Sequence, residues 1–251
     1  MRLFADPFWV QKAGNQPAEY EDALWPIRPV RPLEERHVFR FAIADGATET
    51  SFSCAWANLL VRAVGRGWLF DPEALCDLGR FQAIWKRWVS KKSLPWYAER
   101  KVQDGAFSTI IGVTFSESST DKSGGVWTAS AVGDSCLVQV RGEKALVKFP
   151  FADASAFNSR PFLLCSRAIG NIGYQNEIRS CSNTWERGDA IYLMTDALAC
   201  WFMREDEAGH RPWIELNDIA GPEEFADWVS HRRDAVAMRN DDVTLLRIRS
   251  W

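Results

Sequence analysis

The stretch from Val38 to Thr50 constrains the fold more than any other part of the chain. Its apolar first half, residues 38–44, has the composition of a buried β-strand, and this run ends on the pair Asp45-Gly46. Glycine allows the backbone to turn sharply and brings a carbonyl close to whatever the aspartate binds. The sequence therefore predicts a strand that delivers a carboxylate to the edge of a sheet, although a strand ending in Asp-Gly is by itself most often only a turn.

Further acidic residues stand where other apolar segments begin or end. They are Glu21-Asp22 before residues 23–25, Asp196 after residues 190–195, and Asp241-Asp242 before residues 243–248. If these strand ends meet Asp45, the carboxylates form a site for hard divalent cations, because Mg²⁺ and Mn²⁺ prefer oxygen ligands. Two such ions roughly 3.5–4 Å apart can activate a water molecule and bind a phosphoryl oxygen. The pattern alone fits equally well a set of acids that each cap a turn.

The order of the predicted elements favours an α+β domain. Amphipathic helices are expected from Ser51 to Gly65, from Asp71 to before Pro95, over residues 198–203 and over residues 222–233. Strands are expected at residues 107–115, 126–132, 136–140 and 145–149 as an antiparallel meander, and at residues 178–185 and 190–195 as a hairpin. Residues 150–175 lack a clear pattern and are predicted to be a long loop with some helix. Hairpins rather than long crossovers indicate layered antiparallel sheets.

Composition narrows the class of protein. A chain of 251 residues with 47% hydrophobic and 25% charged content fits one globular domain over residues 1–251. The net charge of -3 and the scattered cations argue against a nucleic-acid partner. No signal peptide and no apolar stretch of membrane-spanning length is found, so we expect a cytoplasmic protein without a membrane partner. The six cysteines lack a metal-binding spacing and are expected to be reduced.

Six short motifs resemble, in order and spacing, those of the metal-dependent protein phosphatases of type 2C, the PPM family. They are Glu21-Asp22-Ala23, Asp45-Gly46, Gly105-Ala106-Phe107-Ser108-Thr109 with Gly112, Ala131-Val132-Gly133-Asp134-Ser135, Leu193-Met194-Thr195-Asp196 and Asp241-Asp242-Val243-Thr244. The resemblance extends from about Trp9 to Ile248 and is to a divergent, bacterial-type member. It implies a four-layer αββα sandwich of two antiparallel β-sheets flanked by helix pairs.

The resemblance also implies a metal centre. Asp45 would bridge two Mn²⁺ or Mg²⁺ ions. Glu21 and the carbonyl of Gly46 would serve one ion, and Asp196 and Asp241 would serve the other. The implied reaction is hydrolysis of a phosphoserine or phosphothreonine ester by a metal-activated water, without a phosphoenzyme.

Two further acids receive roles from the same comparison. Asp22 would hydrogen-bond a metal-bound water, so that Asp22 and Asp45 are the expected catalytic residues. Asp134 would hold a third, weaker ion, although Gly133-Asp134-Ser135 between two strands is equally explained as a structural turn. The three histidines are isolated in polar surroundings and are expected at the surface.

The chain departs from the family pattern where the substrate phosphate binds. Pro17 replaces an arginine that family members commonly place four residues before the Glu-Asp pair, and Lys12 is the nearest cation on the preceding strand. Lysine offers a point charge but lacks the bidentate fork of arginine. Ala47 and Ala197 stand where the family has glycines.

All four core metal carboxylates are nevertheless present, so we expect an active enzyme. Its substrate would be a protein phosphorylated by a partner kinase, and a small phosphate ester is another possible substrate class. The chain would act as a monomer. The alternative is a pseudophosphatase, a regulatory module that binds a phosphoprotein or a kinase without turnover.

Overall fold

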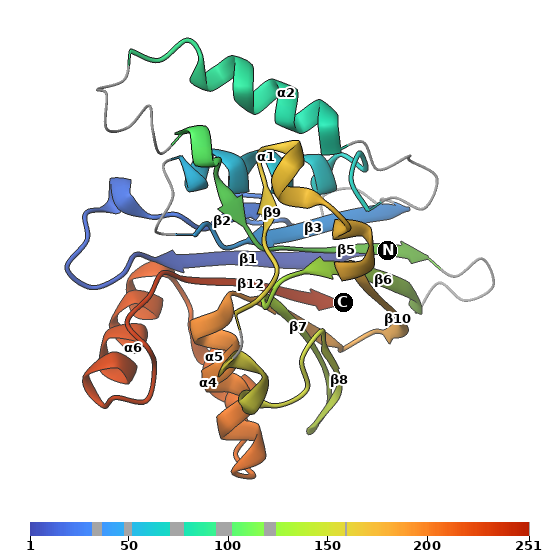
Figure 1. Cartoon of the computed structure of the whole chain (residues 1–251). Helices are drawn as coiled ribbons and strands as arrows, with labels where there is room; N and C mark the ends of the chain where they lie inside the picture. The colour runs from blue at the N-terminus through green and yellow to red at the C-terminus, as the bar shows by residue number, and fades with distance from the viewer. Residues whose placement is uncertain are drawn as a thin grey trace.

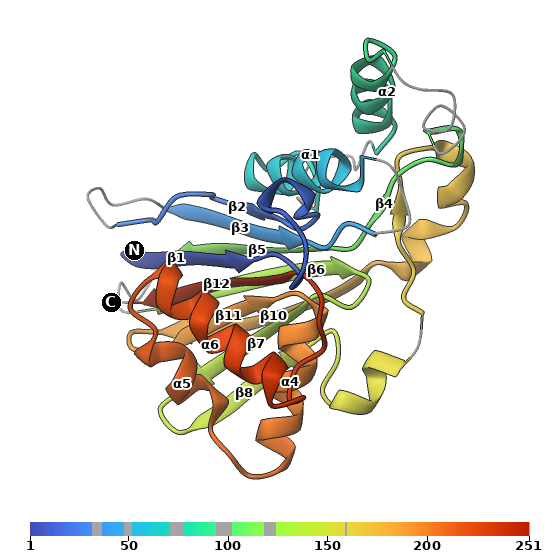
Figure 2. The ribbon, with the colours of Figure 1, turned by 90° about the vertical axis from the view of Figure 1, so that its left-hand side faces the viewer.

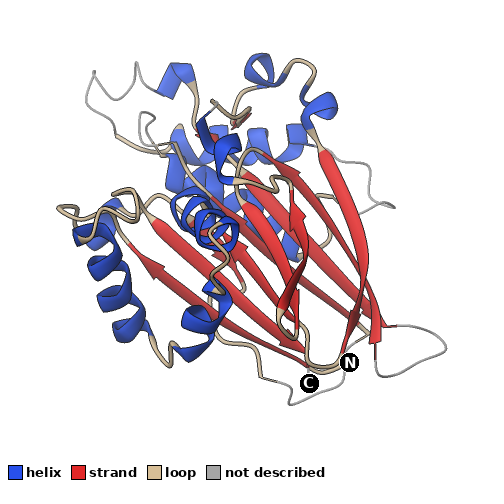
Figure 3. Cartoon of the chain, turned by 90° about the horizontal axis from the view of Figure 1, so that it is seen from below, coloured by secondary structure: helices blue, strands red, loops and turns tan. Residues whose placement is uncertain are grey.

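Two antiparallel five-stranded sheets, packed face to face, form the centre of the protein (Figure 1). This computed structural model describes residues 1–31, 37–47, 52–70, 78–93, 102–117, 124–158 and 160–250. The first sheet has the order β1-β12-β11-β7-β8 and the second β10-β6-β5-β3-β2, and β4 pairs with β9 beside them. Figure 3 shows both chain termini at the same end of the strands, because Leu3 pairs with Ser250.

The strands have the following bounds. The first sheet contains β1 (Leu3–Val10), β7 (Cys136–Arg141), β8 (Lys144–Phe149), β11 (Ala190–Met194) and β12 (Val243–Ser250). The second contains β2 (Ala23–Trp25), β3 (Val38–Ala44), β5 (Ile110–Glu117), β6 (Gly124–Val132) and β10 (Arg179–Glu186). The short pair is β4 (Phe107–Ser108) and β9 (Leu164–Cys165).

Helices cover both outer faces of the sandwich (Figure 2). α1 (Ser53–Gly65) lies on the second sheet with α2 (Leu78–Val89) outside it, and α4 (Asp196–Glu207), α5 (Pro212–Asp218) and α6 (Pro222–Asp234) lie on the side of the first sheet. Short 3-10 turns are η1 (Pro17–Glu19), η2 (Ala154–Asn158), η3 (Ala168–Asn171) and η4 (Tyr174–Glu177). The expected αββα sandwich of two antiparallel sheets is confirmed.

Alternation along β3 shows how the layers are held. Its side chains at Phe39, Phe41 and Ile43 are buried between the two sheets, whereas Ala42 and Ala44 face α1. Successive strand residues point to opposite faces, so β3 supplies large side chains to one core and small ones to the other. Full burial of a large apolar side chain contributes about 1.5–3 kcal/mol. The strand that carries Asp45 is therefore fixed from both sides.

The predicted meander is confirmed in its β5-β6 and β7-β8 pairings but wrong at the junction between them, and the predicted hairpin of β10 and β11 is wrong. β6 and β7 follow each other in sequence but belong to different sheets, and so do β10 and β11. The first crossing is made at Gly133, which has a φ of 101°. A Cβ atom there would lie 2.7 Å from the Cβ of Thr109, so glycine is required by both conformation and space. The crossing matters because it brings Asp134 from one sheet to the other.

Several helix boundaries and one helix differ from expectation. The predicted starts at Ser51 and Asp71 and the predicted stop at Pro95 lie outside the described residues. α5 was not predicted, since its seven residues are too few for a clear helical period. Three 3-10 turns and β9 confirm a loop with some helix within residues 150–175 and just beyond.

The remaining composition-based expectations concern cysteines, histidines and membrane spans. The five described cysteines form no disulfide; two are buried and three are half-buried. All three histidines are exposed, as expected. Among the described residues, none of the helices has the length and apolarity needed to cross a bilayer.

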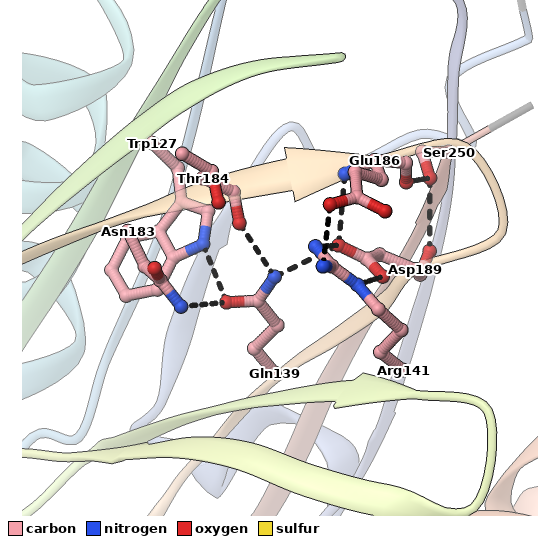
Figure 4. Close-up of polar contacts among 8 residues, drawn as sticks. All are labelled: Trp127, Gln139, Arg141, Asn183, Thr184, Glu186, Asp189 and Ser250. Carbon is pink, nitrogen blue, oxygen red and sulfur yellow. Dashed lines mark hydrogen bonds and ion pairs between the residues drawn. The ribbon is translucent and has the colours of Figure 1, made fainter. Parts of the chain in front are cut away.

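A polar network crosses the end of the sandwich where β11 begins (Figure 4). Gln139 is fully buried, accepts a hydrogen bond from Trp127 Nε1 at 3.0 Å and donates to Asp189 at 2.8 Å. Asp189 also binds Arg141 through two nitrogens, at 2.7 and 2.8 Å. Gln139 further donates to the carbonyl oxygen of Thr184 on β10. The network therefore joins the two sheets at the end opposite the one where β11 delivers Asp196.

Candidate metal centre

Strand pairing in the second sheet brings the first three predicted acids together. Ala23, the first residue of β2, pairs with Ala44, the last residue of β3. Because antiparallel strands run in opposite directions, residues before β2 lie beside residues after β3. Glu21 and Asp22 are thus placed next to Asp45.

The first sheet places its acids at the same edge. Met194, the last residue of β11, pairs near the first residues of both β12 and β7. Asp196 follows β11, Asp241 precedes β12, and Asp134 precedes β7. Acids from five parts of the sequence therefore meet where the two sheets end.

A hollow of about 310 Å³ opens at this edge. Its wall includes four acids, two arginines and neighbouring small or apolar residues: Asp45, Gly46, Ala47, Thr109, Asp134, Phe157, Arg160, Pro161, Leu163, Asp196, Arg239 and Asp241. Glu21, Asp22 and Lys12 are not part of this wall. The structure thus brings four of the predicted acids into one concave surface.

The backbone at Asp45 is held rigidly. The Asp45 N–H donates to Thr109 Oγ1 at 3.0 Å, and the Thr109 N–H donates to the Asp45 carbonyl at 2.8 Å. The Ala47 N–H donates to the Phe107 carbonyl at 3.0 Å, which extends the attachment along the turn. Thr109 Oγ1 also contacts Ser135 Oγ at 2.8 Å and so connects Asp45 with the loop of Asp134.

Gly46 allows the turn to approach the segment before β2 that carries Glu21. A Cβ atom on Gly46 would lie 2.6 Å from the backbone carbonyl oxygen of Glu21. This separation is well inside van der Waals contact, so only glycine fits without a shift of the backbone. The expected approach of the Gly46 carbonyl to a ligand of Asp45 stays a prediction.

Asp22 lies deeper than the hollow and is 2% exposed. Thr244 Oγ1 donates to its Oδ2 at 2.6 Å, and Tyr20 contacts the same threonine hydroxyl. Burial raises the pKa of Asp22 to about 8, and the charges of Asp242 and Asp241 act in the same direction. Asp22 is therefore a carboxyl group that holds a proton near neutral pH in the metal-free chain.

Asp45 experiences the charges of the whole cluster. Its pKa is raised well above the ordinary value, first by burial and then by Asp22, Asp134, Asp241 and Asp242. Burial likewise raises the pKa of Asp134. Acidic groups that repel one another in this way are stabilised by a cation with oxygen-ligand preference, so the donor set fits Mg²⁺ or Mn²⁺.

Asp242 and Glu21 serve the architecture of this edge. The two carboxylate oxygens of Asp242 accept the N–H groups of Lys12 at 2.7 Å and Glu21 at 2.6 Å, which fastens the segment before β2 to β12. The Glu21 carboxylate accepts a hydrogen bond from Ser53 Oγ, in the first residue of α1, at 2.5 Å. Of the adjacent acids Asp241 and Asp242, only Asp241 lines the hollow.

The two arginines in the wall were not identified from the sequence. Arg239 forms an ion pair with Asp196, and its Nε lies 3.7 Å from Asp241 Oδ2. Arg160 lines the wall from the segment between η2 and β9. The arginine two residues before Asp241 was the only sequence signal, and arginine in a polar loop is common.

Within the described residues, no three acidic, histidine or cysteine side chains are drawn together closely enough to hold a metal ion as they stand. The partners above explain the arrangement, because Arg239 binds Asp196 and Ser53 binds Glu21. Metal binding at this edge therefore requires side chains to exchange partners.

Comparison of the sequence with protein-family models and with curated proteins finds no match. Comparison of the structure with solved structures finds clear matches. The serine/threonine phosphatase PstP of Mycobacterium tuberculosis superposes with a TM-score of 0.56 at 16% identity, covering 100% of this chain and 99% of that one. The photosystem II phosphatase PBCP gives a TM-score of 0.54 at 14% identity, with 99% of each chain covered.

The chain has the fold of the type 2C protein phosphatases. The motif-based resemblance to the PPM family is therefore confirmed for the fold, over nearly the full length of the chain. A catalytic domain of PstP solved in complex with two manganese ions matches with a TM-score of 0.51 at 16% identity, over 98% of each chain. At such identities the likeness to type 2C phosphatases describes the fold alone, and the function has to be argued from the residues of this chain.

Proposed function

We propose that this protein is a metal-dependent phosphatase that hydrolyses phosphoserine or phosphothreonine esters in a protein substrate. The observation that carries the proposal is the convergence of Asp45, Asp134, Asp196 and Asp241 on one hollow. The raised pKa values of Asp45 and Asp134 support it, because perturbed carboxyl groups in a concave site are typical of functional centres.

The residues that would hold the ions follow from their places at this edge. Asp45 would serve both ions, Glu21 and the Gly46 carbonyl would serve one of them, and Asp196 and Asp241 would serve the other. Asp134 would hold a third ion. Bound Mn²⁺ or Mg²⁺ would supply an activated water and neutralise charge on the phosphoryl group.

Other residues of the chain would orient and exchange protons. Asp22 is fixed by the hydroxyl of Thr244 and carries a proton up to about pH 8 in the metal-free chain, so its carboxyl group would act as a hydrogen-bond partner and proton store. Thr109 and Ser135 would hold Asp45 and Asp134 in fixed positions relative to each other.

Cations for the substrate phosphate would come from three residues. Lys12 remains the predicted anchor, and Asp242 fixes its backbone at 2.7 Å. Arg160 and Arg239 stand in the wall itself and offer the planar fork that suits phosphate. Substitution of each residue by alanine, with KM and kcat measured separately, ranks the three.

The deciding experiment measures hydrolysis of p-nitrophenyl phosphate and of a phosphothreonine peptide with Mn²⁺, with Mg²⁺ and with a chelator. Turnover that depends on metal should fall by on the order of 100-fold in Asp45→Asn and in Asp196→Asn, because loss of one group that stabilises developing charge has typically this effect. Asp227→Asn, an exposed acid on α6, is the matched control and should retain activity.

Two results would change the conclusion. Turnover that persists in the presence of chelator would refute the metal-dependent mechanism. A folded protein that binds Mn²⁺ but hydrolyses neither substrate would favour the pseudophosphatase, a module that binds a phosphoprotein or its kinase in the cytoplasm. A monomeric state, with a partner kinase as the source of the substrate, is part of the proposal and is tested by light scattering and co-purification.

A further inference from the structure

Arg239 contacts the carboxylates of the hollow with its guanidinium group. It forms an ion pair with Asp196, and its Nε lies 3.7 Å from Asp241 Oδ2. Its charge also lowers the pKa of Asp134 against the effect of burial. One guanidinium group therefore interacts with three of the four acids in the wall.

The position of Arg239 allows this side chain to move. Its side chain is 57% exposed, and it reaches the acids from the loop between α6 and β12. The loop itself is anchored, because the neighbouring Met238 is buried in the core. Arg233 has a different task, since it donates to the backbone carbonyls of Gln11 and Asp241. Arg239 is thus an exposed cation on an anchored backbone.

A guanidinium group and a metal ion compete for the same carboxylate oxygens. The ion pair of Arg239 with Asp196 uses Oδ2, an atom that would otherwise be a ligand. A partly exposed ion pair contributes little to stability, so its exchange is energetically accessible. A divalent ion carries twice the charge of the guanidinium and gains correspondingly more from the cluster.

We infer that Arg239 is a tethered counter-ion that occupies Asp196 and Asp241 in the metal-free protein and that a divalent cation displaces it. The inference rests on the proposed metal centre and adds the residue that sets its affinity. The apparent dissociation constant of the metal rises in inverse proportion to the fraction of molecules in which the acids are free. If Arg239 occupies them in about nine molecules of ten, the metal binds about tenfold more weakly than to the bare acids.

The test measures binding of Mn²⁺ and of Mg²⁺ by calorimetry to the metal-free protein, without substrate. Arg239→Ala should bind Mn²⁺ about 3- to 10-fold more tightly than the wild type. Arg160→Ala removes the same charge from the same wall, but within the described residues Arg160 forms no ion pair with the acids. This variant therefore reports the general electrostatic effect and should change affinity less than about 2-fold. Arg239→Lys keeps the charge, loses the fork and should fall between the wild type and alanine.

A second readout does not depend on metal. In chelator, Arg239→Ala should melt at a lower temperature than Arg160→Ala, because the acids of the hollow lose their counter-ion. Both variants lie on the surface, so folding of either protein is not at risk.

Equal affinities for Arg239→Ala and Arg160→Ala, or weaker binding by Arg239→Ala than by the wild type, would overturn the inference, as would absence of metal binding in every variant. The proposed function is judged separately, by hydrolysis with metal at saturation. A wild type that binds metal without turnover removes the phosphatase proposal, while the comparison of affinities still decides the role of Arg239.

Discussion

Replacement of Asp22 by asparagine should stabilise the metal-free protein at alkaline pH. The carboxyl group is buried, and its pKa in the fold is about 8, compared with 3.8 for the ordinary group. As the pH rises above about 4, the unfolded chain releases this proton while the folded chain keeps it. Stability therefore falls with rising pH between about 4 and 8 and becomes level above that window.

The size of the effect follows from the shift. Each pK unit corresponds to about 1.4 kcal/mol, so the raised pKa of Asp22 costs on the order of 6 kcal/mol at alkaline pH. This is comparable with the total stability of an ordinary domain, which is about 5–15 kcal/mol. Asparagine has nearly the same shape, is neutral at every pH and retains an acceptor for the hydroxyl of Thr244.

The assay is urea unfolding followed by tryptophan fluorescence in chelator, at about pH 5 and about pH 9, on either side of the middle of the window. Asp22→Asn should exceed the wild type by several kcal/mol at the higher pH and by much less at the lower one. Asp227→Asn changes the net charge equally at an exposed site and should shift both values within about 0.5 kcal/mol.

A gain for Asp22→Asn that is the same at both pH values would refute the electrostatic explanation, because a packing effect does not titrate. Absence of any gain at the higher pH would show that the fold relaxes around the charged group. Saturating Mn²⁺ should reduce the advantage of the variant, since a ligand of the native state stabilises the wild type.

Two further substitutions test the architecture. Asp189→Ala should lower the free energy of unfolding by about 2–4 kcal/mol, because it leaves buried donors of the polar network without their acceptor. Glu143→Ala, at an exposed ion pair, should change it by less than about 1 kcal/mol. Equal losses in urea unfolding would contradict this account. Gly46→Ala should weaken Mn²⁺ binding at least about tenfold in calorimetry, because a Cβ only 2.6 Å from the Glu21 carbonyl oxygen would displace the turn. Unchanged affinity would show that the backbone accommodates the methyl group without moving the metal ligands.

The edge of the sandwich was predictable because of how antiparallel strands pair. An acid that ends one strand and an acid that begins its neighbour lie side by side, so the pairing of β2 with β3 and of β11 with β12 brings Asp22 next to Asp45 and Asp196 to the same edge as Asp241. Their roles as metal ligands stay a prediction. The apolar pattern of β3 likewise identified a strand buried on both faces. Local patterns sufficed for these residues.

Sheet membership was not predictable in the same way. The apolar pattern of β6 indicates a buried strand but does not indicate which strand lies beside it. A short connection at Gly133 fits a hairpin as well as a crossing between sheets. β10 and β11 were assigned to one hairpin for the same reason. The error concerns which hydrogen-bonding partner a strand selects, and this depends on the assembled core.

Arg239 could not be found because its role depends on a residue 43 positions away. An arginine in a polar loop belongs to no helical or strand pattern. Its contact with Asp196 arises only when β11 and β12 pair and bring the two residues together. Asp241 and Asp242 illustrate the same point, since two adjacent acids have different tasks once the chain has folded.

The acids of the hollow come from both sheets: Asp45 follows a strand of the second, and Asp196 and Asp241 flank strands of the first. A partly assembled chain with only one sheet in place therefore has only some of the donors. An ion bound here would link the two sheets, and its binding free energy would oppose their separation. Hydrogen exchange should then slow in β3 and β12 together when Mn²⁺ is added, even though these strands share no hydrogen bonds in either sheet.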